Sequence, residues 1–191
     1  MERNEMKVSL GVDLSGSPKN DTGLCVLEVE EGKKSVDISL VKTDVEILQK
    51  IEACSPDIIA IDAPLTPAAN SYMRAADEEM KKYGALPHNL RGMTYLVERG
   101  NKLAQLLTAL GKPHIEVFNA ATAKILGFYD KDRERMQKNL LQLGIEGNIK
   151  KKMLNKDELD AISAALTGYL YLMKKTKEVG DKEGKIVVPK V

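Results

Sequence analysis

The sequence predicts an α/β domain built on a mixed five-stranded sheet that is flanked by helices. Three short β-type segments follow one another near the start of the chain, at 7–14, 24–30 and 35–43. A continuous apolar segment at 57–62 comes after a helix, and the rest of the chain is mainly helical in its periodicity. Consecutive hairpins make the first three strands an antiparallel meander. A right-handed crossover then places the fourth strand beside the first and parallel to it.

Turn and cap residues define the first half of the chain. Ser15-Gly16-Ser17-Pro18 ends the first strand, and a turn at 31–34 joins the second strand to the third. Asp44 is the expected N-cap of a helix over 45–53, because Ile47, Leu48 and Ile51 then share one face. Pro56 ends that region before the apolar fourth strand, which has the composition of a strand buried on both faces.

The second half alternates helices with short strands. We expect a helical insertion at 66–112 between strands four and five, with its clearest helix at 93–110, inside a single domain over 1–191. The remaining expected elements are a fifth strand at 114–118, short helices at 119–127 and 130–143, a long amphipathic helix at 156–175 and a short final strand at 184–189.

Composition excludes several classes of protein. The 191 residues are 43% hydrophobic and 30% charged, which is typical of a folded globular domain rather than a disordered chain. The formal net charge is +1, so binding to nucleic acid needs a local basic patch. No stretch approaches the roughly 20 apolar residues of a membrane span, and we expect no membrane partner. Cys25 and Cys54 form no close-spaced pair, which argues against a zinc ribbon and favours a cytoplasmic location.

Two acids are placed where the expected topology converges. Asp13 lies near the end of the first strand and Asp62 ends the fourth, so both side chains emerge at one edge of the sheet. Two carboxylates there repel each other unless a cation or a proton lies between them. Mg²⁺ or Mn²⁺ is the expected cation, because oxygen ligands suit both ions. The alternative for Asp62 alone is a cap of the helix after Ala63-Pro64.

Three further acids are candidate ligands. Asp157 and Asp160 lie three residues apart and share one face of the late helix, although acids in a first turn also simply offset the helix dipole. Glu116 alternates with Ile115 and Val117 along the fifth strand, which we expect to be internal. It is either a ligand or an exposed strand residue.

Four basic residues are candidate phosphate contacts: Arg74, Arg91, Lys150 and Lys151. The first two belong to the expected insertion, and the two lysines come just before the acidic helix. Most charged side chains on helices and loops are only solvated, and that is the alternative for each of the four.

Six segments spread over nearly the whole chain form a recognisable series: GVDLSGSPKNDTG (11–23), DIIAIDAPLT (57–66), the Arg74 to Asp77 helix, HIEVFNAATAKILG (114–127), DELDAISAALTGYL (157–170) and EGKIVVP (183–189). In their order and spacing they resemble the RNase H-like superfamily and, more narrowly, the domain-of-unknown-function 429 family, whose members are predicted nucleases. Asn119 and Ala76 depart from the narrower family's pattern, where proline and cysteine are frequent.

The resemblance implies a two-metal phosphodiester hydrolase that acts on a nucleic acid or a nucleotide. Asp13 is then expected to bridge both Mg²⁺ or Mn²⁺ ions, with Asp62 and Asp160 each holding one ion. Asp157 or Glu116 completes the set. One ion activates water and the other stabilises the leaving oxygen. His88 and His114 are then expected to be structural or surface residues.

Two other functions are compatible with the same sequence. The first is a nucleotide-binding phosphotransferase of the actin-like type. Ser15-Gly16-Ser17 resembles a phosphate-contacting hairpin, but a homodimer must supply the second copy of the fold. The second is a non-catalytic scaffold or binding protein, since a fold does not fix a function.

Overall fold

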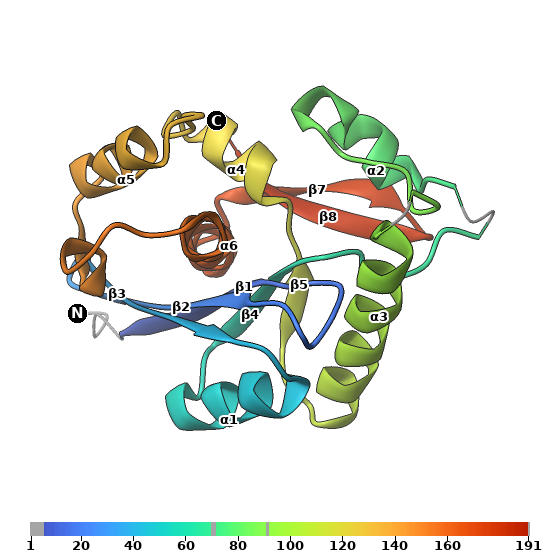
Figure 1. Ribbon diagram of the computed structural model, residues 1–191, viewed down its shortest axis with the longest axis horizontal. Helices are drawn as coiled ribbons and strands as arrows, with labels where there is room; N and C mark the ends of the chain where they lie inside the picture. Colours follow the sequence, from blue (N-terminus) through green and yellow to red (C-terminus); the bar gives the residue numbers. More distant parts are fainter. Residues whose placement is uncertain (1–5, 70–71, 91, 191) are drawn as a thin grey trace.

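A twisted six-stranded sheet forms the centre of the computed structural model, which describes residues 6–69, 72–90 and 92–190 (Figure 1). The strands lie in the order β5-β4-β1-β2-β3-β6, and β7 and β8 form a separate hairpin. The strands are β1 (Lys7–Asp13), β2 (Thr22–Glu30), β3 (Lys33–Val41), β4 (Ile58–Asp62), β5 (His114–Glu116), β6 (Ile145–Gly147), β7 (Thr176–Asp181) and β8 (Gly184–Pro189). The helices are α1 (Asp44–Cys54), α2 (Ala75–Met80), η1 (Lys81–Tyr83), α3 (Met93–Ala109), α4 (Asn119–Ile125), α5 (Arg133–Gln142), η2 (Asn148–Lys150) and α6 (Lys156–Leu172).

The predicted topology is confirmed at its centre and corrected at its edges. β1, β2 and β3 form the antiparallel meander, and β4 pairs with β1 in parallel. The sheet has six strands instead of five, because β6 adds in parallel to β3. β6 is three residues long and ends in Gly147, too short for an alternating pattern. β5 is the edge strand beside β4 and is not internal.

The C-terminal region differs most from the prediction. The late helix ends at Leu172, and Lys174 has a positive φ of 57° that turns the chain back on itself. β7 (Thr176–Asp181) begins two residues later and pairs with the predicted final strand, β8. β8 is therefore absent from the main sheet, and a bridge between Val187 and Val117, just after β5, links it to that sheet.

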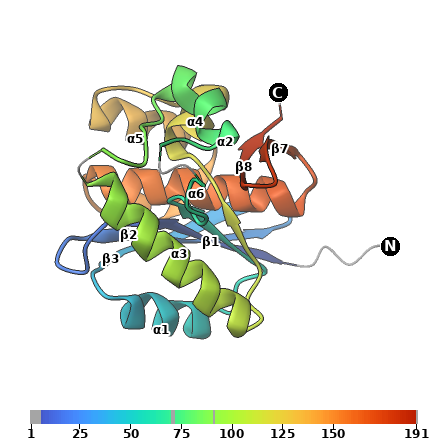
Figure 2. The ribbon, with the colours of Figure 1, turned by 90° about the vertical axis from the view of Figure 1, so that its right-hand side faces the viewer.

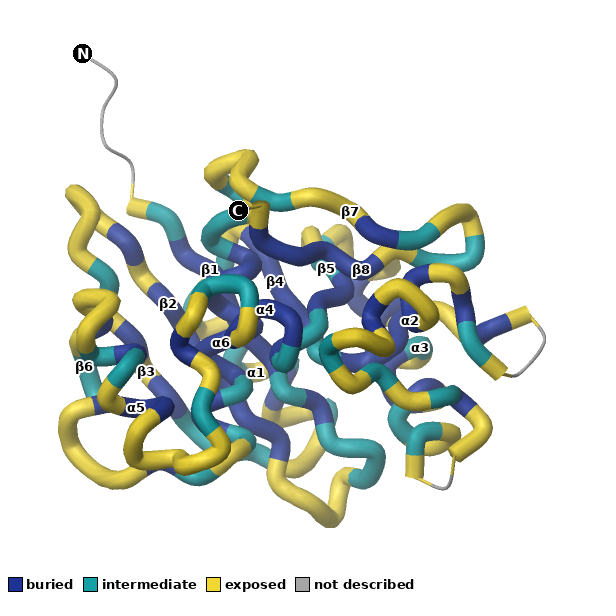
Figure 3. The backbone as a smooth tube through the Cα atoms, turned by 90° about the horizontal axis from the view of Figure 1, so that it is seen from above, coloured by how far each residue is buried: buried dark blue, intermediate teal, exposed yellow. Residues whose placement is uncertain are grey.

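Helices cover both faces of the sheet (Figures 1 and 2). α6 lies across one face, with α4 and α5 packed beyond it, and α1 and α3 cover the other face. Ile47 and Ile51 of α1 and Leu103 and Leu107 of α3 are buried in that second layer. Seen from above, buried residues follow the strands, and many residues of the connecting loops are exposed (Figure 3).

Two glycines let α6 rest directly on the strands beneath it. A Cβ on Gly11 of β1 would lie 2.1 Å from the Ala161 carbonyl oxygen, and one on Gly23 of β2 would lie 2.1 Å from that of Asp157. Real Cβ atoms are never so close to backbone oxygen, so any side chain at either position would lift the helix. The contact holds the first turns of α6 against the ends of β1 and β2.

The N-cap of α1 is Thr43, one residue before the predicted Asp44. The Thr43 side chain accepts a bond from the Glu46 N–H, and the Glu46 carboxylate accepts one from the Thr43 N–H, which is a complete capping box. Asp44 instead accepts a 2.8 Å hydrogen bond from Arg99, which also donates to the Ser15 carbonyl oxygen at 2.7 Å. Arg99 thereby fixes the β1–β2 turn, which begins two residues after Asp13.

Candidate functional site

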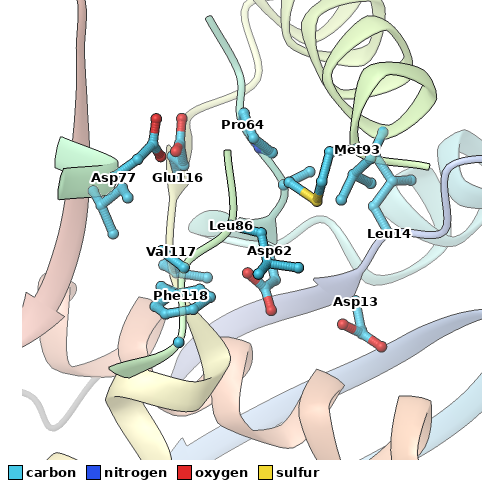
Figure 4. A pocket seen from close by; sticks show the side chains of 15 residues that line it. Asp13, Leu14, Asp62, Pro64, Asp77, Leu86, Met93, Glu116, Val117 and Phe118 are labelled. Atoms are coloured by element: carbon cyan, nitrogen blue, oxygen red, sulfur yellow. The ribbon is translucent and has the colours of Figure 1, made fainter. Parts of the chain in front are cut away.

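Asp13 and Asp62 lie side by side at the carboxyl ends of two neighbouring parallel strands. They are direct partners in the register of β1 and β4. Figure 4 shows their carboxyl groups next to each other on one side of a pocket. Both side chains are partly buried, so they meet in a place from which much of the water is excluded.

The first turns of α6 add two more acids. Asn155 caps this helix and forms a capping box with Glu158, whose carboxylate is buried in that role. Asp157 and Asp160, on either side of Glu158, lie within electrostatic range of Asp13. Asp160 accepts a short hydrogen bond from the Lys156 ammonium, a residue that the sequence analysis did not single out.

The electrostatics of this acid cluster favour a positive charge among the carboxylates. Burial raises the pKa of Asp13 well above its ordinary value, and the charges of Asp62 and Asp160 raise it further. Burial also raises the pKa of Asp62 to about 7, with Asp160 adding to the effect. The Lys156 ammonium lowers the pKa of both residues, as any cation nearby would.

Asn119, the first residue of α4, joins the two aspartates. Its backbone N–H donates to Asp62 Oδ2 at 3.3 Å, and its side-chain Nδ2 donates to Asp13 Oδ1 at 3.2 Å. In the sequence, Asn119 stands out only as a departure from a family pattern. Its position gave a usable signal, because it follows β5, the parallel neighbour of the strand that ends in Asp62.

A pocket of about 200 Å³ opens beside the aspartates (Figure 4). Asp13 and Asp62 lie at one end of it, and Asp77 and Glu116 lie at the other. Most of its other lining is apolar: Leu14 just after β1, Leu86 in the loop before α3, Met93 and Leu96 of α3, Phe118 just before α4 and Ile186 of β8.

Glu116 and Arg74 belong to a separate buried cluster. The Arg74 guanidinium is completely buried and donates to both Glu116 oxygens and to both Asp77 oxygens. Glu116 Oε2 also accepts a 2.8 Å bond from the Leu65 N–H. The structure thus gives Glu116 a cationic partner away from Asp13, and it places Arg74 where no surface phosphate reaches it. His88 lies against the same cluster, with Nε2 2.8 Å from Asp77 Oδ2.

Of the other expected phosphate contacts, the two lysines lie near the β6 edge of the sheet. Lys150 forms an ion pair with Glu146 near the β6 edge, and Lys151 is exposed at the end of η2. Arg91 lies outside the described residues. His114 is partly buried, and its Nδ1 is 2.9 Å from the Lys112 carbonyl oxygen. The two cysteines are free.

The donor set of the acid cluster suits a hard divalent cation. Asp13, Asp62 and Asp160 supply carboxylate oxygens, and Asn119 Oδ1 is a buried amide oxygen without a hydrogen-bond partner. Within the described ranges, however, no three His, Cys, Asp or Glu side chains are close enough as they stand to hold one metal ion. Asp160 is bonded to Lys156 instead.

The raised pKa of Asp62 makes the stability of the metal-free protein depend on pH. The folded protein holds a proton at Asp62 up to about pH 7, whereas the unfolded chain releases it near pH 3.8. Protonation of Asp62 therefore stabilises the folded state, and this stabilisation is lost as the pH rises towards 7. We expect the free energy of unfolding to fall by roughly 2–4 kcal/mol as pH rises from 4 to 8. Urea unfolding in EDTA measures this, and Asp62→Asn should flatten the profile. An equally steep profile in Asp62→Asn would assign the effect to other groups.

Comparison with known proteins identifies the fold. A structure of RuvC from Thermus thermophilus superposes with a TM-score of 0.54 and 15% sequence identity, over 87% of this chain and 96% of the other. The fold is RNase H-like. No family model and no curated protein matches the chain, so the narrower family resemblance stays a prediction. In the part of the chain that the structure describes, no helix is both long and apolar enough to cross a membrane.

Proposed function

We propose that the protein is a metal-dependent nuclease that hydrolyses phosphodiester bonds. One observation carries this proposal: Asp13 and Asp62 meet at the ends of parallel strands on an RNase H-like fold, with Asp160 approaching from α6. Like charges gathered in this way destabilise the folded chain, and they are a common feature of functional sites.

Asp13, Asp62 and Asp160 would hold the divalent cations, with Asp157 as a further candidate ligand. When bound, Mg²⁺ or Mn²⁺ supplies an activated water and stabilises the charge that develops on the leaving oxygen. Asp13 is the central carboxylate of the proposed metal site, because its charge interacts with those of Asp62, Asp157 and Asp160. Lys156 balances part of the negative charge among these carboxylates.

The substrate we propose is a nucleic acid or a nucleotide. The pocket beside the aspartates lets a phosphate approach Asp13 and Asp62 while the organic part of the substrate meets apolar side chains. Arg74 is enclosed in its own ion-pair cluster with Glu116 and Asp77. Lys156 is a basic residue that contacts the acid cluster directly, through its hydrogen bond to Asp160.

A cleavage assay tests the proposal. Single-stranded and duplex DNA, RNA and a branched DNA are incubated with the protein in Mg²⁺, Mn²⁺ or EDTA. We expect cleavage of at least one substrate that needs the cation and is lost in Asp62→Asn. The control is Asp37→Asn, which removes an acid from β3, where Asp37 pairs with Lys50. If no substrate is cleaved and ATP raises the unfolding temperature, the proposed nuclease function would be contradicted. A nucleotide-binding phosphotransferase would then be favoured.

A further inference from the structure

Asn119, at the start of α4, is buried in the acid cluster and hydrogen-bonded to two of its aspartates. Its side chain is only 2% exposed. Its two N–H groups reach Asp62 and Asp13, the two residues that end β4 and β1. A third chain segment, running from β5 into α4, therefore reaches the aspartate pair through this single side chain.

The amide oxygen of Asn119 has no donor. Asn119 Oδ1 is fully buried and accepts no hydrogen bond. A buried acceptor without a partner costs about 1–3 kcal/mol, and folded proteins rarely keep one without a reason. Among its identified neighbours, the carboxylates of Asp13 and Asp62 donate nothing when ionised. The Lys156 ammonium is hydrogen-bonded to Asp160.

We propose that Asn119 Oδ1 is a neutral ligand of the cation that the aspartates bind. This inference rests on the proposed metal-dependent function and adds a ligand from a segment that contributes no acid to the cluster. An amide oxygen is a normal ligand of hard divalent cations. The amide nitrogen keeps Asp13 in place at the same time, so Asn119 acts as a ligand and as a positioning group.

Two substitutions separate the ligand role from the positioning role. Asn119→Ala removes the oxygen and the Nδ2–H donor, and Asn119→Asp removes the donor but keeps an oxygen. Both keep the backbone N–H that bonds to Asp62. If Oδ1 is a ligand, Asn119→Ala weakens Mn²⁺ binding by about tenfold or more, and Asn119→Asp binds at least as tightly as the wild type. If only the donor matters, both variants weaken binding.

The measurement is Mn²⁺ titration by calorimetry, with thermal unfolding in EDTA to show that each variant folds. The matched controls are Asn139→Ala and Asn139→Asp in α5, where a partly buried amide donates to the Phe128 carbonyl oxygen. The charge change in Asn139→Asp is the same as in Asn119→Asp. We expect both controls to bind Mn²⁺ like the wild type.

Each other result overturns a defined part of the inference. Wild-type binding together with unchanged affinity in Asn119→Ala would contradict the ligand role and leave the nuclease proposal standing. If Asn119→Ala does not fold, tenfold weaker binding by Asn119→Asp is the contradicting result. Failure of the wild type to bind Mn²⁺ at millimolar concentration would remove both proposals together.

Discussion

Asp13→Asn should abolish Mn²⁺ binding and reduce cleavage by on the order of a thousandfold or more, because metal ions supply several kcal/mol of transition-state stabilisation. Asp13 is the acid on which the charges of Asp62, Asp157 and Asp160 all act, so its loss disrupts the whole cluster. The same substitution should stabilise the metal-free protein, since it removes a buried charge that its neighbours repel. We expect a gain of roughly 1–3 kcal/mol near pH 8.

Calorimetry with Mn²⁺ and urea unfolding in EDTA measure the two effects on the same preparation. We expect Asp13→Asn to lose Mn²⁺ binding and to gain stability. Functional sites often show this trade-off, because groups that bind a ligand can destabilise the free protein. Asp37→Asn serves again as the control and should change neither quantity by much. A variant at Asp13 that binds and cleaves like the wild type would rule out the carboxylate mechanism.

Arg74→Met should have the largest effect on stability, a loss of about 3–5 kcal/mol at neutral pH. The guanidinium is fully buried and is the cationic partner of both Glu116 and Asp77. Without it, both carboxylates lose their arginine partner in a buried place, and His88 is left beside Asp77. Although burial raises the pKa of Asp77, the bonds from His88 and Arg74 hold it well below its usual range, so this residue stays ionised in the wild type.

Urea unfolding of Arg74→Met measures the loss, and acid pH should recover part of it because Glu116 and Asp77 can then take up protons. A second variant, Arg74→Met with Glu116→Gln, should be more stable than the single variant at pH 7, since one unpaired charge is gone. A loss below 1 kcal/mol in the single variant would show that the cluster contributes little to stability.

Local sequence patterns predicted the central part of this fold. The alternating and continuous apolar segments identified β1 to β4, and the rules of strand connection placed Asp13 beside Asp62. The edge elements were beyond such patterns. β6 has three residues. β7 follows α6 after only a short turn, and its residues fall between the helix predicted over 156–175 and the strand predicted over 184–189.

The candidate site was predictable where it depends on strand ends and not where it depends on side-chain partners. Glu116 has the residue type of a ligand and lies next to the aspartates in the sheet. A buried arginine from α2, 42 positions away in sequence, sets its bonding instead. Asn119 and Lys156 carry no motif of their own. Their roles come from the aspartates that surround them in three dimensions.

The last part of the chain has a consequence for how the protein is made. Synthesis proceeds from the N-terminus, and β1 and β4 leave the ribosome early. The acids of α6 and the hairpin residue Ile186, which lines the pocket, emerge much later. The nascent chain therefore carries its first two aspartates through the synthesis of α2 to α5 before the acid cluster can assemble. The proposed metal site can form only after α6 has been made.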